Sequence, residues 1–117
     1  MIKEADQYFL RQPEPTQSCL LALRNYLLQY KNYSITEVWQ YGMPFYKCNG
    51  KRLCYLWTDK KNGQPYLGIV DGKLIEHPLL IADKRARMKV MYIDPSKDLP
   101  IKTVDTILAM ILSRDKE

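Results

Sequence analysis

Hydrophobic residues near the start of the chain recur every three or four positions, the spacing of a helix buried on one side. The pattern predicts a short helix over Ile2–Arg11. After the proline linker Pro13-Glu14-Pro15 it predicts a longer helix over Thr16–Tyr30, with Thr16 as the N-cap. The predicted core faces of the two helices consist of Ala5, Tyr8, Phe9, Leu20, Leu23, Leu27 and Tyr30.

A helix-start pattern follows at Ser34. Ser34 and Glu37 have the spacing of a capping box, in which each side chain bonds the backbone N–H of the other residue. Tyr33 and Val38 match the hydrophobic staple that accompanies this motif, and Gly42 is a typical residue after a helix end. These residues predict a third, short helix in which Glu37 has a capping role.

From Pro44 the hydrophobic period changes to that of strands. Asn49-Gly50 lies between two aromatic-rich runs, the strongest short-range signal of a tight type I′ hairpin. With Asn49-Gly50 as the loop, Phe45 faces Cys54, and paired residues share a face of the sheet. Cys48 then lies on the opposite face from Cys54, so we expect no disulfide between them. The residues expected beside Cys48 are Tyr46, Leu53, Tyr55 and Trp57.

Three further strands are predicted, and they complete a sheet. They cover Pro65–Val70, Lys73–Ile75 and Arg87–Ile93, and Asp71-Gly72 forms a second hairpin between the first two. A start signal at Asp98-Leu99-Pro100 then introduces a C-terminal helix. Its apolar stripe consists of Ile101, Val104, Ile107, Leu108 and Ile111.

The order of helices, strands and a closing helix indicates an α+β fold. We predict a single domain over residues 1–117, a two-layer sandwich with a five-stranded antiparallel sheet flanked by N-terminal helices and one C-terminal helix. The second face of the sheet is then partly solvated or faces a partner.

Composition is that of an ordinary globular chain, with 46% hydrophobic and 26% charged residues. No apolar run is long enough to span a bilayer and the N-terminus is too polar for a secretory signal, so we expect a cytoplasmic protein without membrane contact. Three cysteines without a Cys-x-x-Cys pair fit a reducing compartment. The net charge of +5 favours either polyanionic partners or simple solubility, and its scatter along the chain favours solubility.

Residue types with catalytic potential are few. The chain has no nucleophile-elbow, phosphate-loop or dinucleotide-binding glycine pattern. His77 precedes Pro78 in a predicted loop, where a surface position is expected. Cys48 and Cys54 lie among aromatic residues in predicted strands and have no adjacent base to stabilise a thiolate. No catalytic residue is predicted.

Metal ligation is also weakly indicated. Glu4 and Asp6 are two positions apart, so they do not share a helix face, and the first helices carry no acidic ridge. Asp94 and Asp98 flank a loop, where turn and capping roles account for both. The residues alone therefore predict neither a metal site nor a cofactor.

The segment Glu37–Tyr46 holds the densest group of distinctive residues. It combines a carboxylate and four aromatic rings with a glycine and a proline. The aromatic rings either fill the core or line a pocket beside the sheet. The candidate positions, for ligand binding or for structure, are Glu37, Trp39, Tyr41, Gly42, Pro44 and Tyr46.

This segment, together with Gly50–Tyr55, the strand carrying Gly68 and the basic run Lys84–Lys89, resembles the YdhG-like family of domains of unknown function. The most specific element is Tyr41-Gly42-x-Pro44-x-Tyr46, and the resemblance covers most of the chain. It implies a frataxin-like two-layer fold. Through that likeness it also implies an intracellular iron chaperone, so iron enters as a cargo by resemblance alone.

The basic run suggests a further hypothesis. In a strand, Arg85, Arg87 and Lys89 would share one side and could contact phosphates, although a solvated sheet face explains the run as well. We therefore expect a non-enzymatic binding module with an unknown small ligand or protein partner, held at the sheet or beside Tyr41–Tyr46. The alternatives are an iron chaperone, and a nucleic-acid or anion binder acting through Lys84–Lys89.

Overall fold

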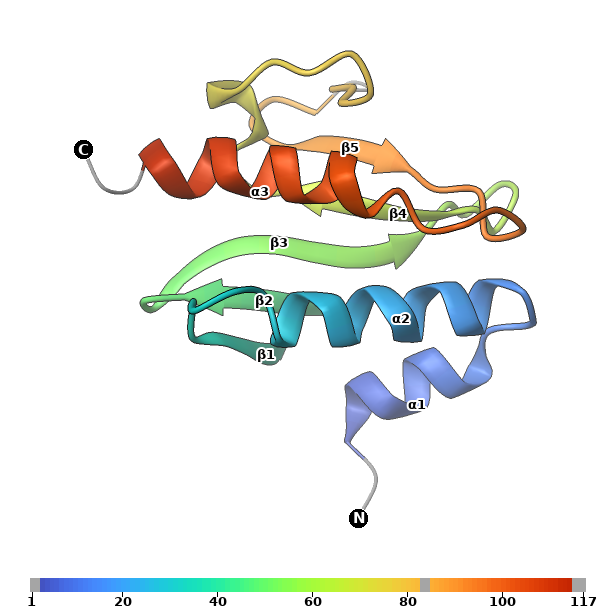
Figure 1. The fold of residues 1–117 in the computed structure, drawn as a ribbon. Coiled ribbons are helices and arrows are strands. Elements are labelled where there is room, and N and C mark those ends of the chain that lie inside the picture. The colour runs from blue at the N-terminus through green and yellow to red at the C-terminus, as the bar shows by residue number, and fades with distance from the viewer. Residues whose placement is uncertain (1–2, 83–84, 115–117) are drawn as a thin grey trace.

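A computed structural model describes residues 3–82 and 85–114 of the chain. Helices and strands follow one another in the order drawn in Figure 1. The helices are α1 (Glu4–Arg11), α2 (Thr16–Leu28) and α3 (Ile101–Arg114), with a short 3₁₀ helix, η1, at Gly72–Leu74. The strands are β1 (Ile35–Gln40), β2 (Met43–Cys48), β3 (Lys51–Thr58), β4 (Pro65–Ile69) and β5 (Lys89–Tyr92).

The five strands form one antiparallel sheet in the order β1-β2-β3-β4-β5, so each strand pairs with its neighbour in sequence. Figure 1 shows α2 and α3 crossing the same face of this sheet, with α1 beside α2. The predicted α+β architecture, a five-stranded antiparallel sheet flanked by helices, is confirmed. The frataxin-like label stays a prediction. No helix within residues 3–82 and 85–114 has the length and hydropathy needed to cross a membrane.

The main core lies between the helices and the sheet. The predicted helical stripes point into it: Leu20, Leu23 and Leu27 of α2 are fully buried, and so are the central residues of the α3 stripe. Ile101, in the first turn of α3, is exposed instead. The Tyr30 hydroxyl donates to an Asp105 carboxylate oxygen at 2.6 Å and thereby ties the end of α2 to α3.

The predicted third helix is wrong, because this segment forms strand β1. All six residues of Ile35–Gln40 pair with β2. The segment is rich in β-branched and aromatic residues, which suit a pleated surface, and pairing with a strand outweighs a local capping motif. Gly42 does not end a helix. It forms the β1–β2 turn with Tyr41, at φ of 73° and 54° respectively.

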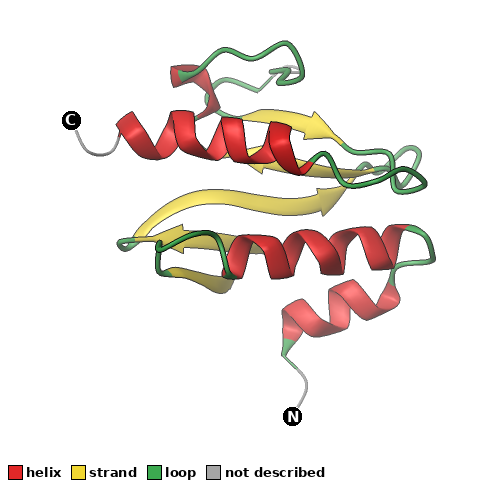
Figure 2. Ribbon diagram, in the orientation of Figure 1, coloured by secondary structure: helices red, strands yellow, loops and turns green. Residues whose placement is uncertain are grey.

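The predicted strand at Lys73–Ile75 is also wrong, since the chain forms η1 there. A hairpin strand would have paired with β4, but β5 occupies that edge through pairs such as Gly68 with Val90. Gly72 packs so closely that a Cβ atom would lie 2.5 Å from the backbone nitrogen of Lys89. The segment between β4 and β5, drawn mainly as loop in Figure 2, forms no full strand and meets β5 through one antiparallel bridge, between Ile81 and Val90.

The Asn49-Gly50 hairpin is confirmed close to its turn, where Cys48 pairs with Lys51 and Lys47 with Arg52. Beyond that point the register shifts, so the predicted pairs of Tyr46 with Leu53 and Phe45 with Cys54 are wrong. Tyr46 pairs with Cys54, and Phe45 pairs with Tyr55. The extra residue on β3 is Leu53, as in a β-bulge, where two residues oppose one.

The bulge changes which side chains share a face. Leu53 and Cys54 both lie in the helix-side core together with Cys48, so the prediction that Cys48 and Cys54 occupy opposite faces is wrong. All three cysteines are nevertheless free and buried. Tyr55 turns to the other face of the sheet, beside Phe45.

That other face, called here the open face, carries a second hydrophobic cluster. Its buried members are Phe45, Tyr55, Tyr66, Val70 and Val90. Gly68 lies beneath the Tyr55 ring, and a Cβ atom on Gly68 would lie 2.2 Å from two of the ring carbons. The glycine therefore leaves room for the tyrosine ring to lie across β4.

We predict that Gly68→Ala lowers the free energy of unfolding by about 2 kcal/mol, because the added methyl group displaces the Tyr55 ring from a packed cluster. Urea denaturation of the single variants and the double variant measures this. In a Tyr55→Ala background the cost of Gly68→Ala should largely disappear. An equal cost in both backgrounds would contradict the proposed contact.

Candidate functional site

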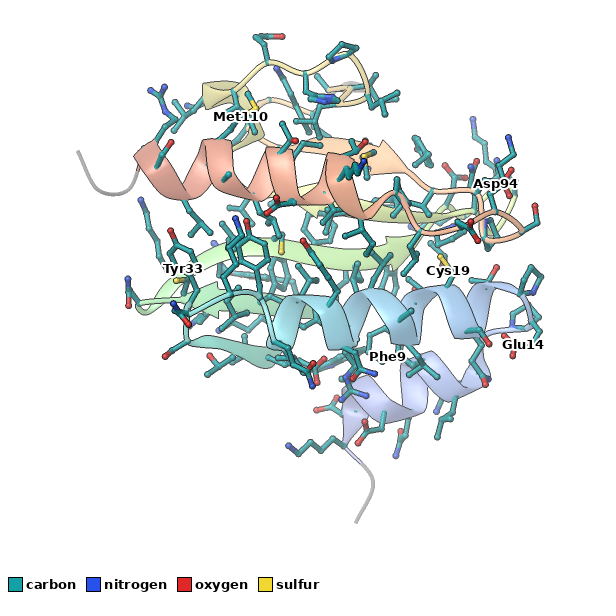
Figure 3. The ribbon with its side chains drawn as sticks, viewed as in Figure 1. Phe9, Glu14, Cys19, Tyr33, Asp94 and Met110 are labelled. Carbon is teal, nitrogen blue, oxygen red and sulfur yellow. The ribbon has the colours of Figure 1, made fainter. Side chains whose placement is uncertain are left out.

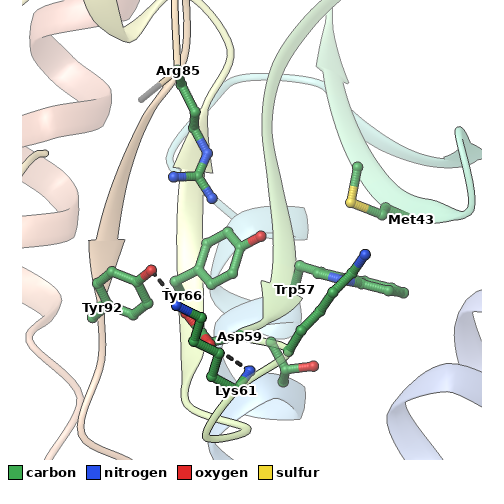
Figure 4. Close-up of a pocket in the computed structure, with 9 residues that line it drawn as sticks. Met43, Trp57, Asp59, Lys61, Tyr66, Arg85 and Tyr92 are labelled. Carbon is green, nitrogen blue, oxygen red and sulfur yellow. Dashed lines mark hydrogen bonds between the residues drawn. The ribbon is translucent and has the colours of Figure 1, made fainter. Parts of the chain in front are cut away.

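The open face bears a cavity of about 430 Å³ at the end where β3 runs into β4. Figure 4 shows the side chains that line this cavity, with Arg85 pointing toward Tyr66. The cavity is lined by Met43, Trp57, Thr58, Asp59, Lys60, Lys61, Tyr66, Arg85 and Tyr92.

Three aromatic rings form its walls because strand pairing brings them to the same side. Tyr66 of β4 pairs with Trp57 of β3 on one side and with Tyr92 of β5 on the other. The ring centroids of Tyr66 and Tyr92 are 5.5 Å apart. Directly paired residues lie side by side on one face, so three successive strands build an aromatic wall.

Asp59 fixes one end of the cavity. One of its carboxylate oxygens accepts the Tyr92 hydroxyl at 3.1 Å, and the other accepts the backbone N–H of Lys61 at 2.7 Å. The Lys61 backbone hydrogen bond, helped by Tyr92, holds the pKa of Asp59 below its ordinary value. Asp59 is therefore ionised at neutral pH.

Positive charge dominates the rim. The Arg85 guanidinium lies 5.6 Å from the centre of the Tyr66 ring, and it hydrogen-bonds the hydroxyls of Tyr55 and Tyr66. Burial, with Tyr66 nearby, raises the pKa of Tyr55, so this phenol stays neutral. Lys60 and Lys61 are exposed at the β3–β4 turn. The lining thus combines three cationic side chains with one carboxylate.

Helix α1 supports the Trp57 wall. The Tyr8 ring stacks on the Trp57 ring with centroids 4.3 Å apart and planes 10° apart. The Tyr8 hydroxyl donates to the Thr58 hydroxyl at 3.2 Å, and burial raises the pKa of Tyr8 to about 12. One face of the Trp57 ring is therefore occupied by α1.

Glu37 and Tyr46 lie on the helix side of the sheet and do not line the cavity. The Glu37 carboxylate accepts two hydrogen bonds from Arg24 of α2, at 2.8 and 2.7 Å, and the Tyr46 hydroxyl at 2.7 Å. Arg24 also pairs with Asp6 of α1 at 2.7 Å. Glu37 is thus a partner of Arg24 and not a helix cap.

The Arg24 network joins four elements. Arg24 and Glu37 retain only 18% and 11% side-chain exposure, and Tyr46 has none. The Arg24 guanidinium also lies 5.0 Å from the centre of the Phe9 ring, which Figure 3 labels between α1 and α2. Burial, followed by the Glu37 hydrogen bond, raises the pKa of Tyr46. These contacts make Glu37 and Tyr46 structural residues.

The other motif positions divide between the faces. Trp39 and Pro44 pair with each other, with Trp39 packed against the helix-side core. Gly42 supplies a positive φ for the turn, and Tyr41 is 76% exposed. The Tyr41 ring contacts Phe45 on the open face, with centroids 5.9 Å apart.

The basic run does not form one side of a strand. Arg85 reaches the cavity, while Arg87 pairs with Asp71 at 2.6 Å. The Lys89 ammonium pairs with Glu76 at 3.0 Å and donates to the Ile75 carbonyl at 2.8 Å. Lys84 lies outside the described residues. Of the candidate anion-binding residues, only Arg85 lines the cavity.

The sequence patterns do not predict the cavity walls as a site. The available signal is strand alternation, because every second residue of a strand lies on the same face. Each of three predicted strands places one aromatic residue in this pattern: Trp57, Tyr66 and Tyr92. Assigning them to a shared face required the register, which the bulge shifts by one residue.

Asp94 and His77, which lie outside the cavity, form hydrogen bonds with residues two positions further along the chain. Asp94 accepts the backbone N–H of Ser96 at 2.9 Å, the expected turn role, and His77 accepts the N–H of Leu79 at 3.1 Å. Within residues 3–82 and 85–114, no three His, Cys, Asp or Glu side chains are grouped so that they could hold a metal ion.

Comparisons with known protein families, with curated proteins and with solved structures found no match. The resemblance to the YdhG-like family therefore remains a prediction. The functional inference depends on the geometry of the open face.

We predict that Glu37→Gln lowers the free energy of unfolding by about 2 kcal/mol, because it removes the better buried of the two carboxylates that pair with Arg24. Glu76→Gln is the matched control, since Glu76 is 92% exposed in its pair with Lys89. A pair whose carboxylate lies in solvent should contribute less than about 1 kcal/mol, and Lys89 keeps its hydrogen bond to the Ile75 carbonyl. Chemical denaturation compares them, and equal losses would mean that the Arg24 pair contributes no more than a surface pair.

Stability should also fall in acid through Asp6. The Arg24 hydrogen bond holds the pKa of Asp6 below its ordinary value of 3.8. A lowered pKa stabilises the folded state fully above 3.8, and this contribution is lost as the pH falls through the folded-state pKa. Denaturation between pH 7 and pH 2 should show a shallower decline for Asp6→Asn. An unchanged pH profile would contradict this linkage.

Proposed function

We propose that this chain is a non-enzymatic binding module that holds an organic anion with a flat apolar part in the cavity on its open face. The observation that carries the proposal is the combination of an aromatic wall, made by Trp57, Tyr66 and Tyr92, with a basic rim. Ligand sites in proteins are typically concave and mostly apolar, with a few polar groups that fix orientation.

The aromatic wall supports a flat ligand. The rings of Tyr66 and Tyr92 are held by neighbouring strands, and Trp57 is held by its stacking on Tyr8. These side chains are positioned before a ligand arrives, so little conformational entropy is lost on binding. Aromatic side chains also favour offset or edge contacts with other rings.

The rim supports a negative charge on the ligand. Arg85, Lys60 and Lys61 bring three cations to the opening, against the single carboxylate of Asp59. Asp59 is already held by Tyr92 and by the Lys61 backbone. Guanidinium groups bind carboxylates and phosphates through directional, charge-assisted hydrogen bonds. Arg85 is the residue we assign to anion recognition.

Iron as a cargo, which the family resemblance implies, receives no support from the described residues. In the first helices Asp6 pairs with Arg24, and Glu14 bonds Ser18 through both carboxylate oxygens. Hard cations need convergent oxygen ligands, and the described part of the chain groups no such set. The aromatic, basic cavity has the wrong chemistry for a cation.

Uridine monophosphate is a suitable probe because it joins a flat ring to a phosphate. In a Trp39→Phe background, Trp57 is the remaining tryptophan and reports binding by its fluorescence. We predict that the nucleotide quenches the Trp57 fluorescence. Uridine, which lacks the phosphate, and inorganic phosphate, which lacks the ring, should each bind more weakly. Calorimetry provides an independent measure.

Arg85→Ala should weaken nucleotide binding by about tenfold or more, since a hydrogen-bonded charge contributes about 1.5–3 kcal/mol. Arg87→Ala is the matched control: it removes the same charge nearby, from a residue that pairs with Asp71 outside the cavity lining. Absence of binding by the nucleotide and by both of its halves at millimolar concentration would overturn the proposal. So would equal effects of the two arginine variants.

A further inference from the structure

A second aromatic and basic feature lies on the open face beyond the cavity. Tyr41, in the β1–β2 turn, exposes 76% of its surface. The Arg52 guanidinium lies 5.0 Å from the centre of its ring and 5.3 Å from that of Phe45. An exposed tyrosine with an arginine against its ring presents a flat surface and a positive charge together.

Turn formation does not explain Tyr41. Both tight hairpin turns of the sheet place two residues at positive φ, and the β2–β3 turn uses Asn49-Gly50, the preferred pair for this geometry. The β1–β2 turn instead places a tyrosine at φ 54°, a region that costs most L-residues roughly 1–2 kcal/mol. Burial does not repay this cost, because Tyr41 is the most exposed of the large hydrophobic residues described. A role in binding explains why an aromatic ring stands there.

Tyr41 is continuous with the cavity. Ring contacts lead from Tyr41 to Phe45 and Tyr55, and on to Tyr66 and Tyr92, with centroid separations of 5.9, 5.2, 6.0 and 5.5 Å. The contacts cross the sheet from the β1–β2 turn to β5. The three central rings are buried and form a floor, whereas Tyr41, Trp57 and Tyr92 remain accessible at its surface.

Apart from Asp59, the charged side chains along this row of rings from Tyr41 to Tyr92 are positive. At one end, Lys47 of β2 lies opposite Arg52 of β3 in the strand register. At the other end, Arg85 lines the cavity. Glu37, the carboxylate of β1, faces the helices and is held by Arg24. Within the described residues, no carboxylate forms an ion pair with Arg52.

We propose that the open face binds single-stranded nucleic acid, one nucleotide occupying the cavity while the strand continues across the sheet to Tyr41 and Arg52. The proposal rests on the function proposed above and extends it to a polymeric ligand. Stacking rings combined with a basic track are the chemistry by which proteins bind single strands without sequence preference. A mononucleotide would fill the cavity alone and leave Tyr41 and Arg52 unused.

Fluorescence anisotropy with labelled (dT)8 and (rU)8 tests the proposal, with uridine monophosphate as the single-site reference. Both oligomers should bind more tightly than the mononucleotide, and the comparison of the two shows whether the ribose hydroxyl contributes. If Arg52, Arg85, Lys60 and Lys61 all neutralise phosphates, the plot of log K against log salt should have a slope of about −3. Arg52→Ala should then make the slope shallower by about 0.7.

The discriminating variant is Tyr41→Asn, which converts this turn to the favoured Asn-Gly pair. It should preserve or raise the free energy of unfolding while weakening oligomer binding about 5- to 150-fold, the range typical of one stacked base. Tyr41→Phe retains the ring and should bind like the parent chain. Lys102→Ala on α3, across the molecule, removes an exposed charge and should change neither affinity nor salt slope.

The outcomes separate the two proposals. If the mononucleotide binds through Arg85 but the oligomers bind no more tightly, and Tyr41→Asn has no effect, the nucleic-acid proposal is overturned and the cavity proposal stands. If neither mononucleotide nor oligomer binds, both are overturned. Tighter oligomer binding that depends on Tyr41 and Arg52, and not on Lys102, supports the extended site.

Discussion

The β-bulge between β2 and β3 decides what each face of the sheet presents. One extra residue, Leu53, reverses the alternation for the rest of β3. Cys54 is sent into the helix-side core, and Tyr55 and Trp57 are sent to the open face. Without the bulge, the open face would lose its central ring and one wall of its cavity. A one-residue irregularity therefore separates a sheet with this aromatic face and cavity from one without them.

The Arg24 network and the bulge support each other. Tyr46 stands at the point where the register shifts, and its hydroxyl is fixed by Glu37 from the neighbouring strand. Arg24 holds Glu37 and Asp6 at once, so the same group places α1 against the sheet. Because Tyr8 of α1 stacks on the cavity wall, a contact on the helix side shapes a site on the opposite face. The most distinctive sequence motif thus builds the scaffold, and the site is formed by other residues.

Local patterns in the sequence predict α1, α2, α3, the hairpin turn at Asn49-Gly50 and the fold class, since helical periodicity and turn chemistry are encoded within short segments. These patterns fail where pairing with another strand decides the local structure. Ser34–Tyr41 carries a genuine capping pattern, yet β2 recruits it into the sheet. The bulge has no signature in the composition of β3. Arg85 was identified as an anion-binding candidate, but its aromatic partners come from three strands, and no single window of sequence contains them together.

The position of Glu37 has a further consequence, for association between molecules. Within the described residues β1 has no strand on its outer side, and such an edge presents unpaired backbone groups to other chains. A charged side chain that points inward from an edge strand discourages this pairing. A foreign strand added beside β1 would have to place its own inward side chains against the Glu37 carboxylate and Arg24. The Arg24–Glu37 pair, part of the network that positions α1, therefore also disfavours the pairing of another chain with this edge.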